Sequence, residues 1–107
     1  MLFRSLVRDS AVLYLEGYLW DPAGAREAMR KAIAIARDEG RAVALSLSDP
    51  FCVDRHRADF LDLVDNHVDI VFANEHELTS LYETDDLDAA FNEVMPLVKV
   101  EIGRAHV

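Results

Sequence analysis

The sequence is poor in cysteine and glycine and has no long apolar run. Its single cysteine, Cys52, excludes an internal disulfide and any zinc site built from several cysteines, so we expect a reducing, cytoplasmic setting. No apolar run approaches the ~18 residues that a membrane-spanning helix needs, and we therefore expect no membrane partner. Only 4 glycines and 3 prolines interrupt the 107 residues, which contain no repeat or low-complexity segment.

Basic side chains are missing from a long stretch of the chain. Residues 58–98 hold 11 of the 20 acidic residues and no Lys or Arg, and the whole chain has a net charge of −9. Because such a surface repels a phosphate backbone, we expect no nucleic-acid partner. Solvated helix faces account for this acidic excess, and a site for a divalent cation is the alternative. The length and the 51% apolar composition are typical of a single folded domain.

The two ends of the chain do not read as protein. The opening string Met1–Ser5 and the closing string Ile102–Val107 each resemble translated sequencing adapter, each in the orientation that its end requires. We therefore expect residues 1–5 and 101–107 to be artefacts that, like fusion scars, are not part of the fold. The remaining residues, 6–100, would be the central portion of a longer domain.

Apolar runs alternate with helical patterns along the chain. Short runs predict buried strands at 11–15, 42–47 and 68–73, with 97–100 as the approach to a fourth. Apolar residues at spacings of three and four predict helices from about 22 to 39, 54 to 65, 75 to 82 and 86 to 95. This order indicates right-handed parallel crossovers. Since the strands are apolar on both faces, we expect an α/β fold of three or four parallel strands with helices on both faces.

Polar residues follow each predicted strand at its carboxyl end, where open parallel sheets bind ligands. The three groups are Glu16–Tyr18, Ser48–Pro50 and Asn74–Glu77. From spacing alone each is equally a turn or a helix cap, because Asp-Pro is a common turn pair and Asn74 with Glu77 fits a variant of the capping box. A structural and a functional interpretation both stay open at this point.

The segment Val71–Leu78, with the sequence VFANEHEL, resembles the strand-end Asn-x-x-Glu motif of the ribokinase-like (pfkB) family of carbohydrate and nucleoside kinases. Residues 14–20 and 45–57 resemble the adenosine-kinase-like bacterial branch of that family, so the resemblance covers about residues 10–100. It implies a three-layer, Rossmann-type fold. It also implies transfer of the γ-phosphoryl group of ATP to a sugar or nucleoside by a parent enzyme that could be a homodimer. Asn74 and Glu77 would help bind ATP and its Mg²⁺, largely through water.

The resemblance also defines what the chain lacks. The family's catalytic base is an Asp in a Gly-Ala-Gly-Asp type of loop that supplies a backbone anion hole, and no such string occurs here. We therefore expect no catalytic residue in this chain and no activity from it alone. Arg55 and Arg57 follow the second strand and could approach a phosphate. The alternative is a non-catalytic, receiver-like or interaction module based on Asp49, although only one acid, Glu16, follows the first strand.

Overall fold

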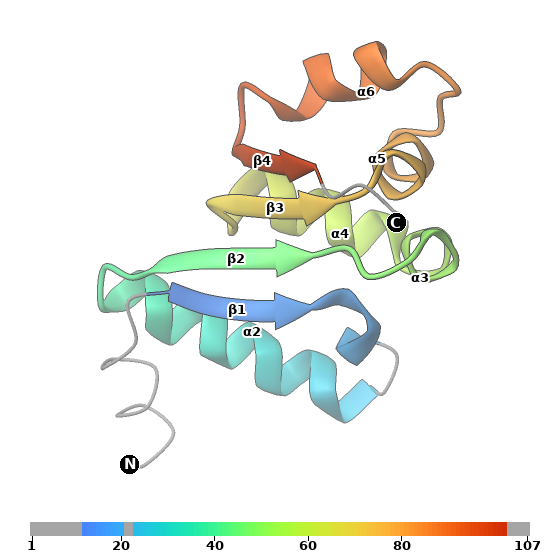
Figure 1. Cartoon of the computed structure of the whole chain (residues 1–107). Helices are drawn as coiled ribbons and strands as arrows, with labels where there is room; N and C mark the ends of the chain where they lie inside the picture. Colours follow the sequence, from blue (N-terminus) through green and yellow to red (C-terminus); the bar gives the residue numbers. More distant parts are fainter. Residues whose placement is uncertain (1–11, 21–22, 103–107) are drawn as a thin grey trace.

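The computed structural model describes residues 12–20 and 23–102, which form a parallel sheet and its helices (Figure 1). In chain order the elements are β1 (Val12–Glu16), the 3-10 helix η1 (Gly17–Trp20), α2 (Ala23–Asp38), β2 (Ala42–Ser46), α3 (Pro50–Arg55), α4 (Arg57–Asn66), β3 (Ile70–Ala73), α5 (Glu75–Leu81), α6 (Leu87–Val94) and β4 (Lys99–Ile102). The predicted Asp-Pro start of the first helix, at residues 21 and 22, lies outside the described residues.

The four strands form one sheet in the order β1-β2-β3-β4. All three pairings are parallel, with Val12 opposite Ala42, Ala44 opposite Ile70, and Ile70 opposite Lys99. Each strand therefore pairs with the strand that follows it along the chain. The predicted α/β class and the parallel strands are confirmed.

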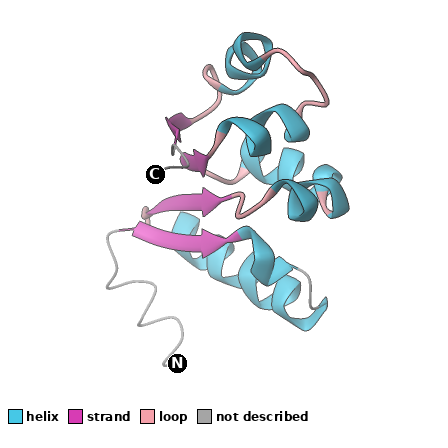
Figure 2. Ribbon diagram, turned by 45° about the vertical axis from the view of Figure 1, so that its right-hand side comes forward, coloured by secondary structure: helices cyan, strands magenta, loops and turns pink. Residues whose placement is uncertain are grey.

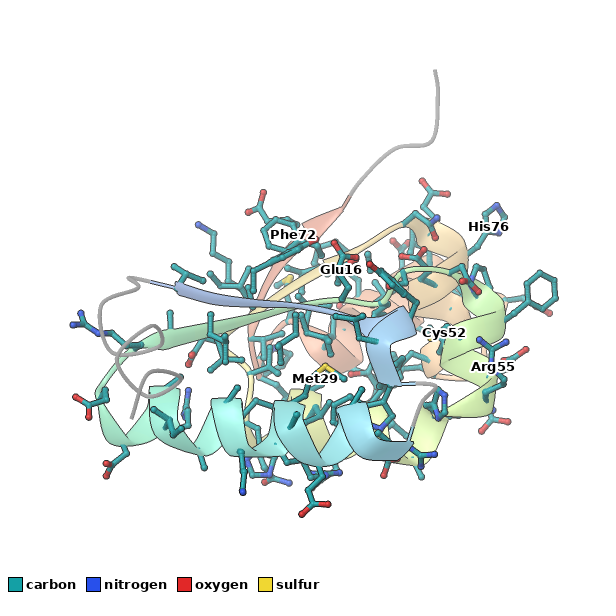
Figure 3. All side chains as sticks on the ribbon, turned by 90° about the horizontal axis from the view of Figure 1, so that it is seen from below. Glu16, Met29, Cys52, Arg55, Phe72 and His76 are labelled. Atoms are coloured by element: carbon teal, nitrogen blue, oxygen red, sulfur yellow. The ribbon has the colours of Figure 1, made fainter. Side chains whose placement is uncertain are left out.

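The helices of the described part gather on one face of the sheet, as Figure 2 and the edge-on view in Figure 3 show. Val43, Leu45 and Val71 are fully buried on this face, whereas Tyr14 and Phe72 on the other face are 51% and 38% exposed. When consecutive strands are added in one direction, right-handed crossovers return every helix to the same side. The described part thus has two layers, where we expected helices on both faces of the sheet.

The helix after β2 differs from its prediction in start and continuity. It begins at Pro50, with Asp49 as N-cap, rather than near Asp54. The Asp49 carboxylate accepts a hydrogen bond from the backbone N–H of Cys52 at 2.8 Å. At His56, with φ −124° and ψ 27°, the helix is interrupted and α4 then begins. Proline in the first turn is favourable because its missing N–H has no partner there in any case.

The last strand also extends past its predicted end. β4 reaches Ile102 and pairs Glu101 with Phe72, so the expected boundary after Val100 lies inside a strand. Residues 1–5, the other segment expected to be an artefact, lie outside the described residues. Within the described part, no helix is both long and apolar enough to cross a membrane.

A single core lies between the sheet and the helices. Its largest fully buried side chains include Trp20, Phe60, Leu45 and Leu63. The indole N–H of Trp20 donates to the Asp59 carboxylate at 3.0 Å, which satisfies the one polar group of that side chain. This core fixes the strand ends from which the loops at the carboxyl edge project.

Candidate functional site

The carboxyl ends of the parallel strands lie at one edge of the sheet, where the turns after β1, β2 and β3 come together (Figure 1). All three polar groups that the sequence singles out are at this edge. In open α/β sheets it is the usual place for a ligand. The edge is the candidate functional site.

Asn74 and Glu77 meet in a reciprocal capping box at the start of α5. The Asn74 side-chain oxygen accepts from the backbone N–H of Glu77 at 2.8 Å, and Glu77 Oε1 accepts from the backbone N–H of Asn74 at 2.9 Å. The capping interpretation of this pair is therefore correct. It does not exclude a second role, because a carboxylate with two oxygens has about four acceptor positions and the box uses one.

Glu77 is the one charged side chain among the buried residues of the described part, at 5% exposure. Burial raises the pKa of its carboxyl group above the ordinary value, the backbone N–H of Asn74 opposes that shift, and the negative charge of Asp49 adds to it. Asp49 and Glu77 follow the ends of the neighbouring strands β2 and β3. A buried acid with a perturbed pKa at a strand-end edge is a feature of functional sites.

The oxygen atoms at this edge suit a hard cation such as Mg²⁺. Within residues 12–20 and 23–102 no group of three or more His, Cys, Asp or Glu side chains could hold a metal ion. Asn74 and Glu77 would thus supply few ligands to Mg²⁺, and water and phosphate oxygens would complete its shell, as is usual for this ion. The donor set fits a shared metal site and does not fit a closed protein cage.

The turns after β1 and β2 are held tightly together. A Cβ atom added to Gly17 would lie 2.9 Å from the carbonyl oxygens of both Leu47 and Ser46, so only glycine allows this approach. The backbone N–H of Tyr18 donates to Ser48 Oγ at 3.0 Å. The sequence placed these residues at the strand ends but gave no sign that they touch.

Arg57 makes its hydrogen bonds to the end of α5 and to α3. Its guanidinium donates to the Ser80 carbonyl at the end of α5, with distances of 3.0 Å from Nε and 2.9 Å from Nη2. It also pairs with Asp54. These bonds use Arg57 to satisfy a carbonyl group near the C-terminus of α5.

Comparisons with known proteins give a consistent result. Residues 2–107 match the family model described as pfkB family carbohydrate kinase. A probable sugar kinase from Rhizobium etli CFN 42 is 48% identical, with a TM-score of 0.88 over 92% of this chain and 31% of its own. Adenosine kinase from Sinorhizobium meliloti is 46% identical, with a TM-score of 0.87 over 94% of this chain and 32% of its own.

A more distant structure shares the fold. Adenosine kinase from Trypanosoma brucei brucei is 19% identical, with a TM-score of 0.70 over 94% of this chain. No curated protein matches the sequence. The chain spans about a third of the length of these sugar kinase and adenosine kinase structures, 31% and 32%.

Proposed function

We propose, from the premise that this chain belongs to the pfkB family of carbohydrate kinases, that it is the central segment of a longer ATP-dependent kinase. That enzyme would transfer the γ-phosphoryl group of Mg-ATP to a hydroxyl group of a sugar or nucleoside. One observation carries the proposal: the Asn74–Glu77 pair, with Glu77 buried, lies at the carboxyl edge of the parallel sheet, in a chain of this family.

The chemistry of phosphoryl transfer explains what this pair would do. Charge is spread over the transferred group's oxygens in the transition state, and Mg²⁺, when bound, neutralises part of it. Asn74 and Glu77 keep acceptor positions that the capping box leaves unused, and these can accept hydrogen bonds from metal-bound water. Because the box fixes both side chains, they need little reorganisation when the nucleotide arrives.

The acceptor's proton needs a base that this chain does not supply. The sequence contains no Gly-Ala-Gly-Asp type of loop, so we place the catalytic Asp in the part of the enzyme beyond this segment. Alone, the 107-residue chain is then inactive. Adenosine and simple sugars are the acceptor classes to test first, since the similar structures are a probable sugar kinase and an adenosine kinase. We place the enzyme in the cytoplasm, with a homodimer as one possible assembly.

A chimeric enzyme tests the proposal directly. Residues 12–102 would replace the matching segment of the Sinorhizobium meliloti adenosine kinase, to which this chain is 46% identical. We expect ATP-dependent, Mg²⁺-dependent phosphorylation of adenosine by the chimera within about 100-fold of the host's kcat/KM, a difference of about 2.7 kcal/mol. Ribose and fructose 6-phosphate would be assayed beside adenosine.

Two controls define the opposite result. A chimera that folds with the host's melting temperature but phosphorylates none of the three acceptors would favour a non-catalytic α/β module. The isolated 107-residue chain is the second control, and steady phosphate transfer by it would contradict the assignment of the base to another segment.

A further inference from the structure

The turn after β2 has an unusual backbone. Ser48 has a φ of 73°, which is rare for a residue other than glycine. The backbone N–H of Asp49 donates to the carbonyl of Leu47 at 2.9 Å, across the single residue Ser48. A bond of this span around a positive φ is the strained form of the γ-turn. Glycine would adopt this conformation at lower cost, so the serine side chain must bring something that glycine cannot.

The Ser48 hydroxyl is the link between two loops of the candidate site. Its oxygen accepts the backbone N–H of Tyr18, the second residue of η1, at 3.0 Å. The strained turn also connects the end of β2 to Asp49, which is the N-cap of α3. Gly17 fits against the end of β2 in the same place. Figure 3 shows Glu16, just before this contact, near the same edge of the sheet as His76 at the start of α5.

We infer that Ser48 is a positioning residue of the proposed kinase, which uses a strained γ-turn and its hydroxyl to hold the turn after β1 against the end of β2 at the edge of the active site. The inference rests on the proposed function. Ser48 takes no part in the two hydrogen bonds of the Asn74–Glu77 pair, which is at the start of α5, after the neighbouring strand β3. Its effect passes through the backbone of Tyr18 and through Asp49.

Backbone strain and the hydroxyl bond can be separated by two substitutions in the chimera. Ser48→Gly relieves the strain and removes the hydroxyl. Ser48→Thr keeps a hydroxyl but adds a β-branch where φ is positive, which increases the strain. A merely structural residue would make activity follow stability in both variants. A positioning residue makes activity follow the hydroxyl group and not the stability.

We expect Ser48→Gly to melt at or above the temperature of the unsubstituted chimera and to lose at least fivefold in kcat/KM for the acceptor. The KM for Mg-ATP should stay within twofold, since the Asn74–Glu77 pair is in a different turn, at the start of α5. Ser48→Thr should melt lower and keep its kcat/KM within twofold. If Ser48→Gly retains the full kcat/KM, the inference is wrong, whether or not the threonine variant folds.

Failure of the proposed function would give a different result, namely an unsubstituted chimera without kinase activity. In that case amide hydrogen exchange in the 107-residue chain tests the positioning role. Ser48→Gly should speed exchange at the Tyr18 N–H at least fivefold and leave the Val43 N–H, which is bonded to Asp69 at 2.8 Å, unchanged. Unaltered exchange at Tyr18 would overturn the claim that the hydroxyl holds this turn.

Discussion

Glu77 combines a structural and a proposed chemical role in one carboxyl group, and substitution can separate them. Burial raises its pKa, so the folded state favours the protonated form. A group whose pKa is raised by folding stabilises the protein at low pH. This stabilisation is lost as the pH rises from the group's pKa in the unfolded chain, about 4.3, through its pKa in the folded state. Ionisation of Glu77 in the folded state therefore costs stability.

Glu77→Gln in the chimera is the first test at the residue scale. The amide oxygen of Gln can still accept the Asn74 N–H, so we expect the melting temperature at pH 7 to stay the same or to rise. Turnover should fall by about 10–1000-fold, or ~1.4–4 kcal/mol, because the charge near the metal is lost. Excess Mg²⁺ should restore part of it. The measurement is turnover against Mg²⁺ concentration, beside a melting curve.

The matched control for this substitution is the N-cap of another helix, α6. Asp86 caps α6 through hydrogen bonds to the N–H groups of Asp88 and Ala89. Asp86→Ala should cost about 1 kcal/mol of stability and leave turnover unchanged. A Glu77→Gln variant with a lower melting point and normal turnover at every Mg²⁺ level would assign Glu77 to capping alone.

Asp69 offers a test of pH dependence at the opposite edge of the sheet. Its carboxylate accepts two bonds from Arg37 at 2.9 and 2.8 Å and one from the Val43 N–H at 2.8 Å. Partial burial raises the pKa of the Asp69 carboxyl group, but these hydrogen bonds lower it by more, so the pKa is below its ordinary value. A carboxyl group whose pKa is lowered by folding stabilises the protein fully at pH values above its pKa in the unfolded chain, about 3.9. This stabilisation is lost as the pH falls through its pKa in the folded state.

We expect Asp69→Asn to destabilise the 107-residue chain by about 1 kcal/mol at pH 7, a modest value because the side chain is partly exposed. The difference should shrink as pH falls below about 4. Chemical denaturation at pH 7 and pH 3 would measure it. Glu101→Gln, which removes one exposed partner of the 4.0 Å Lys99 pair, is the control and should change stability by less than about 0.5 kcal/mol. An equal Asp69→Asn effect at both pH values would contradict the assignment.

At the scale of elements, the end of α2 depends on one glycine. Gly40 has a φ of 71°, and the backbone N–H groups of Gly40 and Arg41 donate to the carbonyls of Arg37 and Ala36. This is the Schellman arrangement, which satisfies carbonyls that the helix leaves free. An added Cβ would meet no atom within 4 Å, so conformation alone decides the effect of a substitution.

Gly40→Ala should destabilise the chain by about 1 kcal/mol because alanine disfavours a positive φ. Gly24, which is within α2 and also has no atom within 4 Å of an added Cβ, provides the opposite control. Gly24→Ala should stabilise by about 0.5 kcal/mol. Thermal melting of the two variants would measure both effects, and equal changes of the same sign would refute the conformational argument.

Local chemistry explains which elements the sequence could predict. Gly40 as a helix stop, the Asn74 cap and the apolar run from Val43 to Leu45 are each encoded within a few residues. The start of α3 is recognisable too, since Asp49-Pro50 is a helix-start signal, but the same pair is common in turns and the apolar spacing predicts a start only near Asp54. The positive φ of Ser48 had no signal, because it depends on contacts with the turn after β1.

The arrangement of layers depends on the order of all the strands, so it could not be predicted from individual strands. Apolar residues on both faces, such as Val71 and Phe72, predicted helices on both sides of the sheet. In the described part, the consecutive order of the strands instead places the helices on one side of the sheet. In the same way, the convergence of three polar groups at one edge was predictable from parallel strands, whereas the bond between Tyr18 and Ser48 was not.

The ends of the chain provide a test at the whole-molecule scale. Residues 1–5 and 101–107 are the segments expected to derive from adapter. Removing residues 1–5 and 103–107, which leaves β4 complete, should change the free energy of unfolding by much less than about 2 kcal/mol, the scale of one buried apolar side chain. Removing residues 101–107 should cost more, since it deletes the pairing of Glu101 with Phe72 and of Ile102 with Ala73. Denaturant titration of the two truncated chains measures the difference. A large loss from the shorter truncation would refute the adapter origin.

The strand order has a consequence for how the chain reaches its structure. Val12 pairs with Ala42, Ala44 with Ile70, and Ile70 with Lys99, so every pairing closes a segment of only about 30 residues. No described strand has to wait for a partner from a distant part of the sequence. On the ribosome, where synthesis at about 5–20 residues per second is slow compared with local folding, the sheet can grow one strand and its helices at a time. The newest strand then serves as the template for the one that follows.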